Sequence, residues 1–117
     1  MYSDGYRVVH KIGPTTAGGA TAEFDVVEHS RDVLGSVERV LGTLKFQHDT
    51  IPAVGVKGWT NECVLAVVRA RLREFQAGPY ECYENGIALD HVEKALAALE
   101  LRTSNRVARG VEGTHSA

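Results

Sequence analysis

The sequence predicts an α+β protein, in which a small antiparallel β-sheet is followed by a long antiparallel helical hairpin. The chain before residue 58 is rich in Thr, Gly and β-branched residues, a composition that favours strands joined by turns. After that point, two apolar stripes with helical spacing are separated by a Gly-Pro break, which is typical of two adjacent helices. We therefore expect a sheet region over residues 1–58 and a helical hairpin over residues 59–117.

The composition excludes several broad classes of protein. The chain has 117 residues, 44% of them apolar, which suits one folded domain and not a disordered chain. Its longest apolar run, Cys63–Val68, has six residues, too few for a membrane span, and its first residues lack a secretory signal. The presence of 2 cysteines fits a reduced, cytosolic protein. A charge of −2 removes the bulk attraction to nucleic acid.

Short segments of the first region predict a sheet of about three to five strands. The best strand candidates are residues 6–12, 23–28 and 44–47. A loop rich in Gly, Pro and Thr separates the first two, over residues 13–21. Residues 36–41 are ambiguous between strand and helix. Pro52 makes residues 51–54 an edge strand or an irregular segment, because proline cannot donate to a sheet.

The second region has a clear helical period. Thr60 is a suitable N-cap, and residues 77–79, Ala-Gly-Pro, end the first helix. The apolar stripe between them is formed by Leu65, Val68, Leu72 and Phe75. A longer helix begins near residue 80 or 81, with a seam formed by Cys82, Asn85, Leu89, Val92, Leu96, Leu99 and Thr103. The short connection predicts antiparallel helices, and small alanines on the second helix favour oligomerisation through the hairpin.

Asn85 is a polar residue at a seam position where the pattern calls for an apolar one. It either sets the register of the packed helices, a documented role for such residues, or it hydrogen-bonds the edge of a ligand. Sequence alone leaves both readings open.

Charge is segregated along the second helix. Residues 81–100 carry five acids against one lysine, whereas the next ten residues carry no acid and three arginines, Arg102, Arg106 and Arg109. Spacings of 4 and 3 place these guanidinium groups on one helical face. They either compensate the helix dipole or bind phosphate, for which a planar guanidinium is well suited. The tail, residues 109–115, is either a glycine-rich anion-binding nest or a frayed end.

The two clusters of polar residues lie too far apart to share a small ligand within one hairpin. Asn85 precedes Arg102 by 17 residues, or roughly 25 Å of helix at 1.5 Å per residue. Phe75 lies near the turn, close to Asn85. If the clusters cooperate, the arginines come from a second protomer packed antiparallel on the first, which makes two equivalent pockets. An aromatic ring, an amide and arginines together suit a nucleotide-like ligand.

Catalysis finds little support in the sequence. The 5 histidines are scattered, without the spacing of a metal site, and no nucleophile or phosphate-loop motif is present. Cys63 and Cys82 are interpreted as small buried hydrophobes. Tyr80 and Tyr83 either pack the turn or line a pocket, and packing is favoured. We expect no enzyme activity, no cofactor and no metal.

Several short motifs occur in one order from about residue 44 to the end. They are Leu44-Lys-Phe-Gln47, Val54-Gly-Val56, Thr60-Asn-Glu62, Arg71-Leu-Arg-Glu-Phe-Gln-Ala-Gly-Pro79, Glu84-Asn85, Ala88-Leu89, Arg102-Thr103, Arg106 and Arg109-Gly-Val-Glu-Gly-Thr-His115. Together they closely resemble the first family of phage Thoeris anti-defence proteins. The resemblance is weak before residue 44.

The resemblance implies a sponge that sequesters cyclic ADP-ribose signals made by bacterial TIR-domain enzymes, without cleaving them. The expected ligand is glycocyclic ADP-ribose, bound between protomers of a homodimer or hexamer in the host bacterial cytoplasm. The hairpin is related to that of phage anti-CBASS sponges. Some hexameric members also accept cyclic oligonucleotides at a separate site, so cyclic di- or trinucleotides are further expected ligands.

The resemblance also assigns roles to residues of the hairpin. Phe75 would stack on the adenine, and Asn85 would hydrogen-bond the ligand. Arg102, with Arg106 or Arg109 from a partner chain, would hold the phosphates. The C-terminal tail thereby becomes part of the ligand-binding region.

The sequence departs from the family at a few places. His48-Asp49-Thr50 replaces an Asn-Gly-Pro turn, Lys57-Gly-Trp59 alters the loop before the first helix, and Tyr83 stands where an arginine is common. These changes leave the hairpin pocket intact but argue against a second, loop-lined oligonucleotide site. Two other functions are compatible with the sequence, a nucleic-acid-binding helical adaptor and a hydrolase of the same signalling nucleotide.

Overall fold

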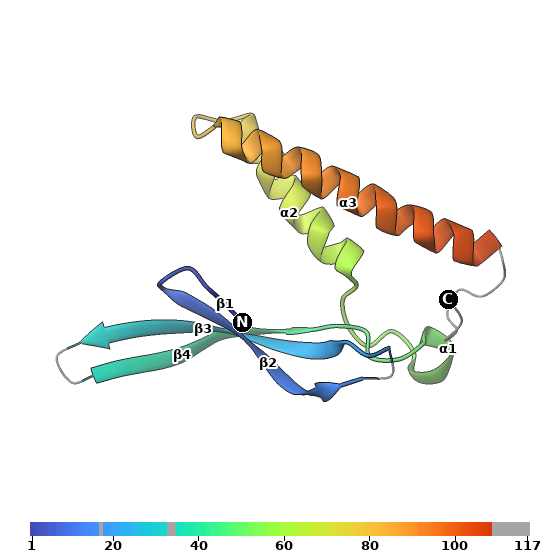
Figure 1. The fold of residues 1–117 in the computed structure, drawn as a ribbon, viewed down its shortest axis with the longest axis horizontal. Coiled ribbons are helices and arrows are strands. Elements are labelled where there is room, and N and C mark those ends of the chain that lie inside the picture. The colour runs from blue at the N-terminus through green and yellow to red at the C-terminus, as the bar shows by residue number, and fades with distance from the viewer. Residues whose placement is uncertain (17, 33–34, 109–117) are drawn as a thin grey trace. The chain divides into compact units, whose positions relative to one another are not determined.

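The structure, a computed structural model, describes residues 1–16, 18–32 and 35–108, in which four strands precede three helices (Figure 1). The elements are β1 (Tyr2–Ser3), β2 (Arg7–Thr15), β3 (Thr21–Asp32), β4 (Gly35–Lys45), α1 (Ile51–Val54), α2 (Asn61–Gln76) and α3 (Tyr83–Ala108). The predicted α+β class is confirmed. The chain forms two compact units, Met1–Trp59 and Thr60–Ala117. Over the described ranges, none of the helices is both long enough and apolar enough to span a bilayer.

The four strands form one antiparallel sheet in the order β1-β2-β3-β4. Valines pair across its centre, where Val9 lies opposite Val26 and Val27 lies opposite Val40. The register of β3 and β4 shifts between Val26 and Val27, the kind of irregularity that increases the local twist of a sheet. Val27 and Ala22 are the buried hydrophobic residues described in this unit.

The strands are longer than the sequence predicts. Residues 36–41, which are ambiguous in the sequence, are strand, because residues 36–40 pair with residues 27–31 of β3. β2 also continues to Thr15, through Gly13 and Pro14, where a loop is predicted. A register shift between Ile12 and Thr15 takes up the proline, which has no N–H for a regular ladder.

The prediction for residues 51–54 is wrong, because this segment is the short helix α1 and not a strand. Thr50 has an extended backbone and precedes a first turn that contains Pro52. Proline is well tolerated there, since the N–H that it lacks would have no partner inside the helix. Gly55, with φ 77°, ends the helix and donates its N–H to the Ile51 carbonyl at 2.7 Å.

Gln47 holds the loop around α1 to the end of the sheet. Its Nε2 atom donates to the carbonyl oxygens of Asp49 and Gly55, at 2.9 and 2.8 Å, and its Oε1 atom accepts the Lys57 N–H at 2.9 Å. Beyond this loop, the Trp59 N–H donates to the Lys45 carbonyl at 2.9 Å. The Gln47 side chain therefore binds backbone groups on both sides of α1, and the backbone of Trp59 joins the end of this segment to the end of β4.

The second unit is an antiparallel pair of helices, α2 and α3 (Figure 1). Thr60 caps α2 as predicted, because its Oγ1 atom accepts the Cys63 N–H at 3.1 Å. Leu96 of the predicted seam is 3% exposed, and Arg73 of α2 bridges to Glu93 of α3 at 3.0 Å. α3 begins at Tyr83, slightly later than predicted.

Candidate functional site

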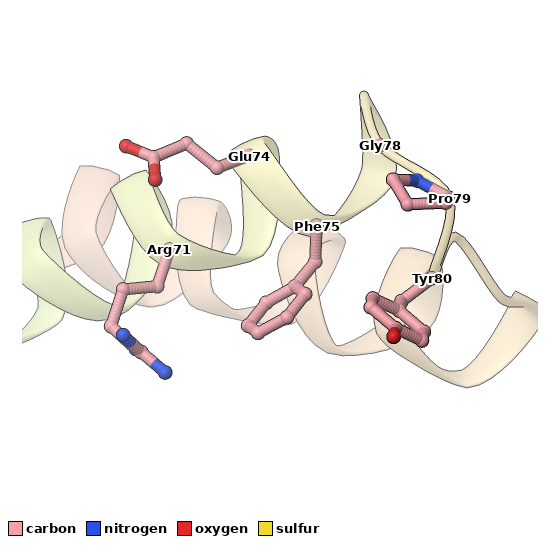
Figure 2. Close-up of a pocket in the computed structure, with 6 residues that line it drawn as sticks. All are labelled: Arg71, Glu74, Phe75, Gly78, Pro79 and Tyr80. Carbon is pink, nitrogen blue, oxygen red and sulfur yellow. The ribbon is translucent and has the colours of Figure 1, made fainter.

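A shallow pocket of about 220 Å³ lies at the end of α2 (Figure 2). Its described lining residues are Arg71, Glu74, Phe75, Gly78, Pro79 and Tyr80. The Phe75 ring is 40% exposed, and the guanidinium carbon of Arg71 lies 5.6 Å from its centroid. In Figure 2 the side chains of Arg71, Phe75 and Tyr80 point to one side of α2, whereas the Glu74 carboxylate points away from them.

The local sequence explains why Phe75 stands at the rim of this pocket. Ala77 still has helical backbone angles, and its N–H contacts three carbonyls of the last turn. The Gly78 N–H then donates to the Phe75 carbonyl at 3.2 Å, and Pro79 prevents the helix from continuing. The chain leaves the helix beside the ring, and Tyr80 follows in the loop with 76% of its surface exposed.

Gln76 closes the loop between the two helices. Its Nε2 atom donates to the Cys82 carbonyl at 2.9 Å, and its Oε1 atom accepts the Cys82 N–H at 3.0 Å. Cys82 in turn stands before α3, where its sulfur accepts the Asn85 N–H at 3.4 Å and its carbonyl accepts the Gly86 N–H at 3.2 Å. This clamp holds Cys82 outside the helix, which is why α3 begins later than predicted.

The structure separates the predicted site residues into two groups within the hairpin. Phe75 lies in the last turn of α2, and Asn85 lies half-buried in the first turn of α3, across the same loop. Arg102 and Arg106 lie near the far end of α3. Arg102 is exposed, but Arg106 is 7% exposed and already engaged within the chain. Arg109 lies outside the described residues.

Three interpretations of residues near the helix ends are corrected by the structure. Cys63 and Cys82 are both exposed and are not buried hydrophobes. Each instead makes a hydrogen bond at the start of a helix, to Thr60 and Asn85 respectively. Tyr80 lines the pocket and does not pack the turn.

Sequence reasoning missed Arg71 as a member of the site. Arg71 and Phe75 are four residues apart on a helix, and that spacing brings two side chains together on one face. The spacing is present in the sequence, but Arg71 is not part of the apolar stripe that contains Phe75. Tyr80 carried no comparable signal, because its direction depends on the loop.

Cys63 has a distinct local environment at the start of α2. The Thr60 hydroxyl donates to the Cys63 sulfur at 3.2 Å and lowers the pKa of that thiol below its ordinary value. The nearby Glu62 carboxylate raises the same pKa to a smaller extent. Hydrogen bonding to the charged form of an acid stabilises that form, so the Cys63 thiolate forms more readily than that of a free cysteine.

A second pocket, of about 480 Å³, lies in the sheet unit. Its lining includes the basic or ionisable side chains of Lys45, His48 and Lys57, and one acid, Glu23. His48 and Lys57 belong to the two segments in which the sequence departs from the Thoeris anti-defence pattern. The pocket therefore carries more potential cations than anions.

Comparison with known proteins identifies a relative of this chain. No family model matches this chain. The chain is 43% identical over 75 residues to Thoeris anti-defense 1 of Bacillus phage SBSphiJ7. The matched region covers 64% of this chain and 53% of the relative, so the chain spans about half the length of the curated relative that it matches. The similarity confirms the predicted resemblance of this chain to the Thoeris anti-defence proteins.

Proposed function

We propose that the chain is a non-enzymatic sponge, which sequesters a TIR-generated cyclic ADP-ribose signal and so inhibits Thoeris defence in the infected bacterial cytoplasm. The similarity to a Thoeris anti-defence protein supports the biological role. The observation that carries the ligand class is the Phe75 ring, which stands 40% exposed in a pocket beside a guanidinium group. An open aromatic face with an adjacent cation suits a purine that carries phosphate.

The size of the pocket indicates which part of the ligand it takes. Its volume of about 220 Å³ lies below the ~300–1,000 Å³ of complete small-molecule sites. It suits the base alone, so the ribose and diphosphate groups need further contacts. We propose that these come from a second protomer packed antiparallel, whose Arg102 reaches the turn of the first. The minimal functional assembly would then be a homodimer, from which a hexamer could be built.

Sequestration requires slow release of an unchanged ligand. A nucleotide enclosed between two protomers leaves only when the contacts of both are broken, which lengthens its residence time. Stacking on Phe75, a hydrogen bond to Asn85 and charge-assisted bonds to Arg102 would together supply the affinity. None of these three groups needs to act as a base or nucleophile.

The first experiment tests ligand capture with purified protein and a panel of cyclic ADP-ribose isomers. We expect tight binding by calorimetry, and recovery of intact ligand after the complex is heated. Phe75→Ala should weaken binding by about 5- to 100-fold, since stacking of a base is worth ~1–3 kcal/mol. Asn85→Ala and Arg102→Ala should also weaken it, with the oligomer unchanged. Lys94→Ala, an exposed site on α3, is the control and should bind normally.

Each contrary result identifies a different error. Unchanged affinity in all three variants would reject the pocket. Release of a cleaved product would indicate the rival hydrolase. Salt-sensitive binding of duplex DNA, without binding of the cyclic nucleotides, would indicate the nucleic-acid adaptor.

The departures at residues 48–50 and 57–59 argue against the family's own loop-lined oligonucleotide site, but His48 and Lys57 line the pocket in the sheet unit, which makes that pocket a separate candidate site for cyclic di- or trinucleotides. Its volume of about 480 Å³ lies within the usual range for ligand sites, and Lys45, His48 and Lys57 could neutralise phosphates. We expect a cyclic trinucleotide to bind protein that is already saturated with cyclic ADP-ribose. Lys57→Glu should lower the affinity for the trinucleotide and leave that for cyclic ADP-ribose unchanged. Competition between the two ligands would place both in one site and reject the second pocket.

A further inference from the structure

The Phe75 pocket has a cation of its own, which the partner-supplied arginines do not explain. Arg71 is exposed, and its guanidinium carbon lies 5.6 Å from the Phe75 centroid. Both side chains come from α2, four residues apart, and both line the pocket. A cation over an aromatic ring is attracted by the electron density of the ring face. Arg71 therefore lies beside the ring on which a base would stack.

The neighbouring arginine on the same helix has a different role. Arg73 donates to Glu93 of α3, with nitrogen-to-oxygen distances of 3.0 and 3.1 Å, so its charge is balanced within the hairpin. In the described chain, Arg71 contacts the Phe75 ring, and its guanidinium N–H groups can still donate to a ligand. Arg73 therefore joins the two helices, whereas Arg71 remains available for such a contact.

The acid in the pocket does not cancel the Arg71 charge. Glu74 also lines the pocket, but its carboxylate points away from Arg71 and Phe75 in Figure 2. Tyr80 lies on the other side of the Phe75 ring from Arg71 in the same view. The exposed part of the pocket is thus bounded by a guanidinium at one end and a phenol ring at the other.

We propose that Arg71 and Tyr80 are ligand-contacting residues, in which Arg71 selects phosphorylated nucleotides over nucleosides and Tyr80 provides a second wall for the base. This inference rests on the proposed function, because it assumes that a base stacks on Phe75. It extends that function by placing a phosphate contact and the base contact in one protomer. Phosphate selection then begins before any partner arginine engages the ligand.

The test compares a phosphorylated with an unphosphorylated ligand, cyclic ADP-ribose and adenosine, in calorimetric titrations. Arg71→Gln removes the charge but keeps a long side chain and a good helix former. We expect it to weaken the binding of cyclic ADP-ribose by about 10- to 100-fold, which corresponds to the loss of a charge-assisted hydrogen bond. The affinity for adenosine should change little. Arg71→Lys should recover part of the loss, because it restores charge without the planar fork.

Arg73→Gln is the matched control on the same helix. It removes an arginine two residues away whose charge is paired with Glu93, and it should leave both affinities within about threefold, since exposed ion pairs contribute little. The affinity of the wild type for cyclic ADP-ribose should fall with salt, and Arg71→Gln should reduce that dependence. If the role of Arg71 were purely structural, Arg71→Gln would instead lower the affinities for both ligands together and leave the salt dependence unchanged.

Tyr80 is tested by two substitutions. Tyr80→Ala should lower the affinities for cyclic ADP-ribose and for adenosine by a similar factor of about 5 to 100, because stacking does not depend on phosphate. Tyr80→Phe should retain most of the affinity, since the ring is kept.

The results separate this inference from the function on which it rests. If the wild type binds the cyclic ligand, and Arg71→Gln and Tyr80→Ala bind it equally well, the inference fails and the function stands. If the wild type binds no cyclic ADP-ribose isomer, the function fails and the inference fails with it. Equal weakening of both ligands by Arg71→Gln, without a change in salt dependence, also overturns phosphate selection.

Discussion

The Thr60 hydroxyl has two roles at the start of α2. It accepts the Cys63 N–H and donates to the Cys63 sulfur. The first contact satisfies a helix N–H that has no partner within the helix. The second stabilises the thiolate and lowers the pKa of Cys63. One side chain therefore sets both the beginning of a helix and the reactivity of an exposed thiol.

The alkylation rate of Cys63 should reveal this contact. In a Cys82→Ser background, we expect Thr60→Val to shift the pH midpoint of alkylation by iodoacetamide upward, because the hydroxyl that favours the thiolate is lost. Thr60→Ser keeps the hydroxyl and should retain the low midpoint. Equal pH profiles for the valine and serine variants would show that the hydroxyl does not control the thiol.

The sign of the effect on stability follows from the same shift. The pKa of Cys63 is lower in the folded chain than in the unfolded chain, so the contact adds stability above the unfolded pKa and loses it as pH falls through the folded pKa. Any gain in unfolding free energy relative to Thr60→Val should therefore be largest under alkaline conditions.

Residue-level prediction from sequence worked where the local chain determines the outcome. Thr60 caps its helix as predicted, because capping involves only residues within one turn. The direction of Tyr80 and the burial of Arg106 depend on what the rest of the fold places beside them, and neither is encoded in the spacing of nearby residues. The pairing of Arg71 with Phe75 is an intermediate case, since i,i+4 spacing allows the contact but an arginine has many other rotamers.

At the scale of elements, the return of the chain to the sheet depends on Gly58. The Trp59 N–H donates to the Lys45 carbonyl, and the Gln47 N–H donates to the Trp59 carbonyl, each at 2.9 Å. A Cβ atom at Gly58 would clash with the Lys45 carbonyl oxygen and lie 2.9 Å from its carbon. A glycine is therefore required where the two backbones approach one another.

Gly58→Ala should destabilise the sheet unit by about 1–3 kcal/mol, the usual effect of forcing an extra group into a packed site. Urea denaturation followed by tryptophan fluorescence measures the change, because Trp59 is the next residue. Gly42→Ala is the matched control, as a Cβ atom there meets nothing within 4 Å. A loss of stability in Gly42→Ala as large as that in Gly58→Ala would contradict a steric cause.

Element prediction succeeded best for the helices and least well at residues 51–54. The helical stripe of α2 recurs at four positions over about three turns, so one atypical residue does not obscure it. The segment at 51–54 is a single turn, and its proline is compatible with either a sheet edge or a helix start. The extended Thr50 and the loop held by Gln47 decide the outcome, and neither could be deduced from four residues.

At the scale of the whole molecule, little of the described chain is fully buried. Among the residues whose burial is described, the buried ones are Ala22, Val27, Leu96 and Arg106. Meanwhile Val67, Leu101 and Val107 of the hairpin are each at least 60% exposed. These side chains are among the apolar groups of α2 and α3 that the proposed assembly through the hairpin would cover.

We expect the purified protein to have a mass of two or more times the 12.7 kDa of one chain, as measured by sedimentation equilibrium. Leu101→Asp should shift the population toward the monomer, because a buried unpaired charge at an interface is costly. Glu100→Gln, at the adjacent exposed residue, should leave the mass unchanged. A wild-type monomer that still captures the ligand would contradict a pocket shared between protomers.

The clamp that Gln76 forms on both backbone groups of Cys82 has a thermodynamic consequence for capture. A loop that must become ordered around an arriving molecule subtracts that entropy from the affinity. Here the loop between α2 and α3 is already held by the side-chain amide of Gln76. A ligand that binds beside Phe75 would therefore meet a preorganised loop. Replacing Gln76 by alanine would leave every contacting side chain in place, yet it would lower the affinity, because the loop would then become ordered only when the ligand binds.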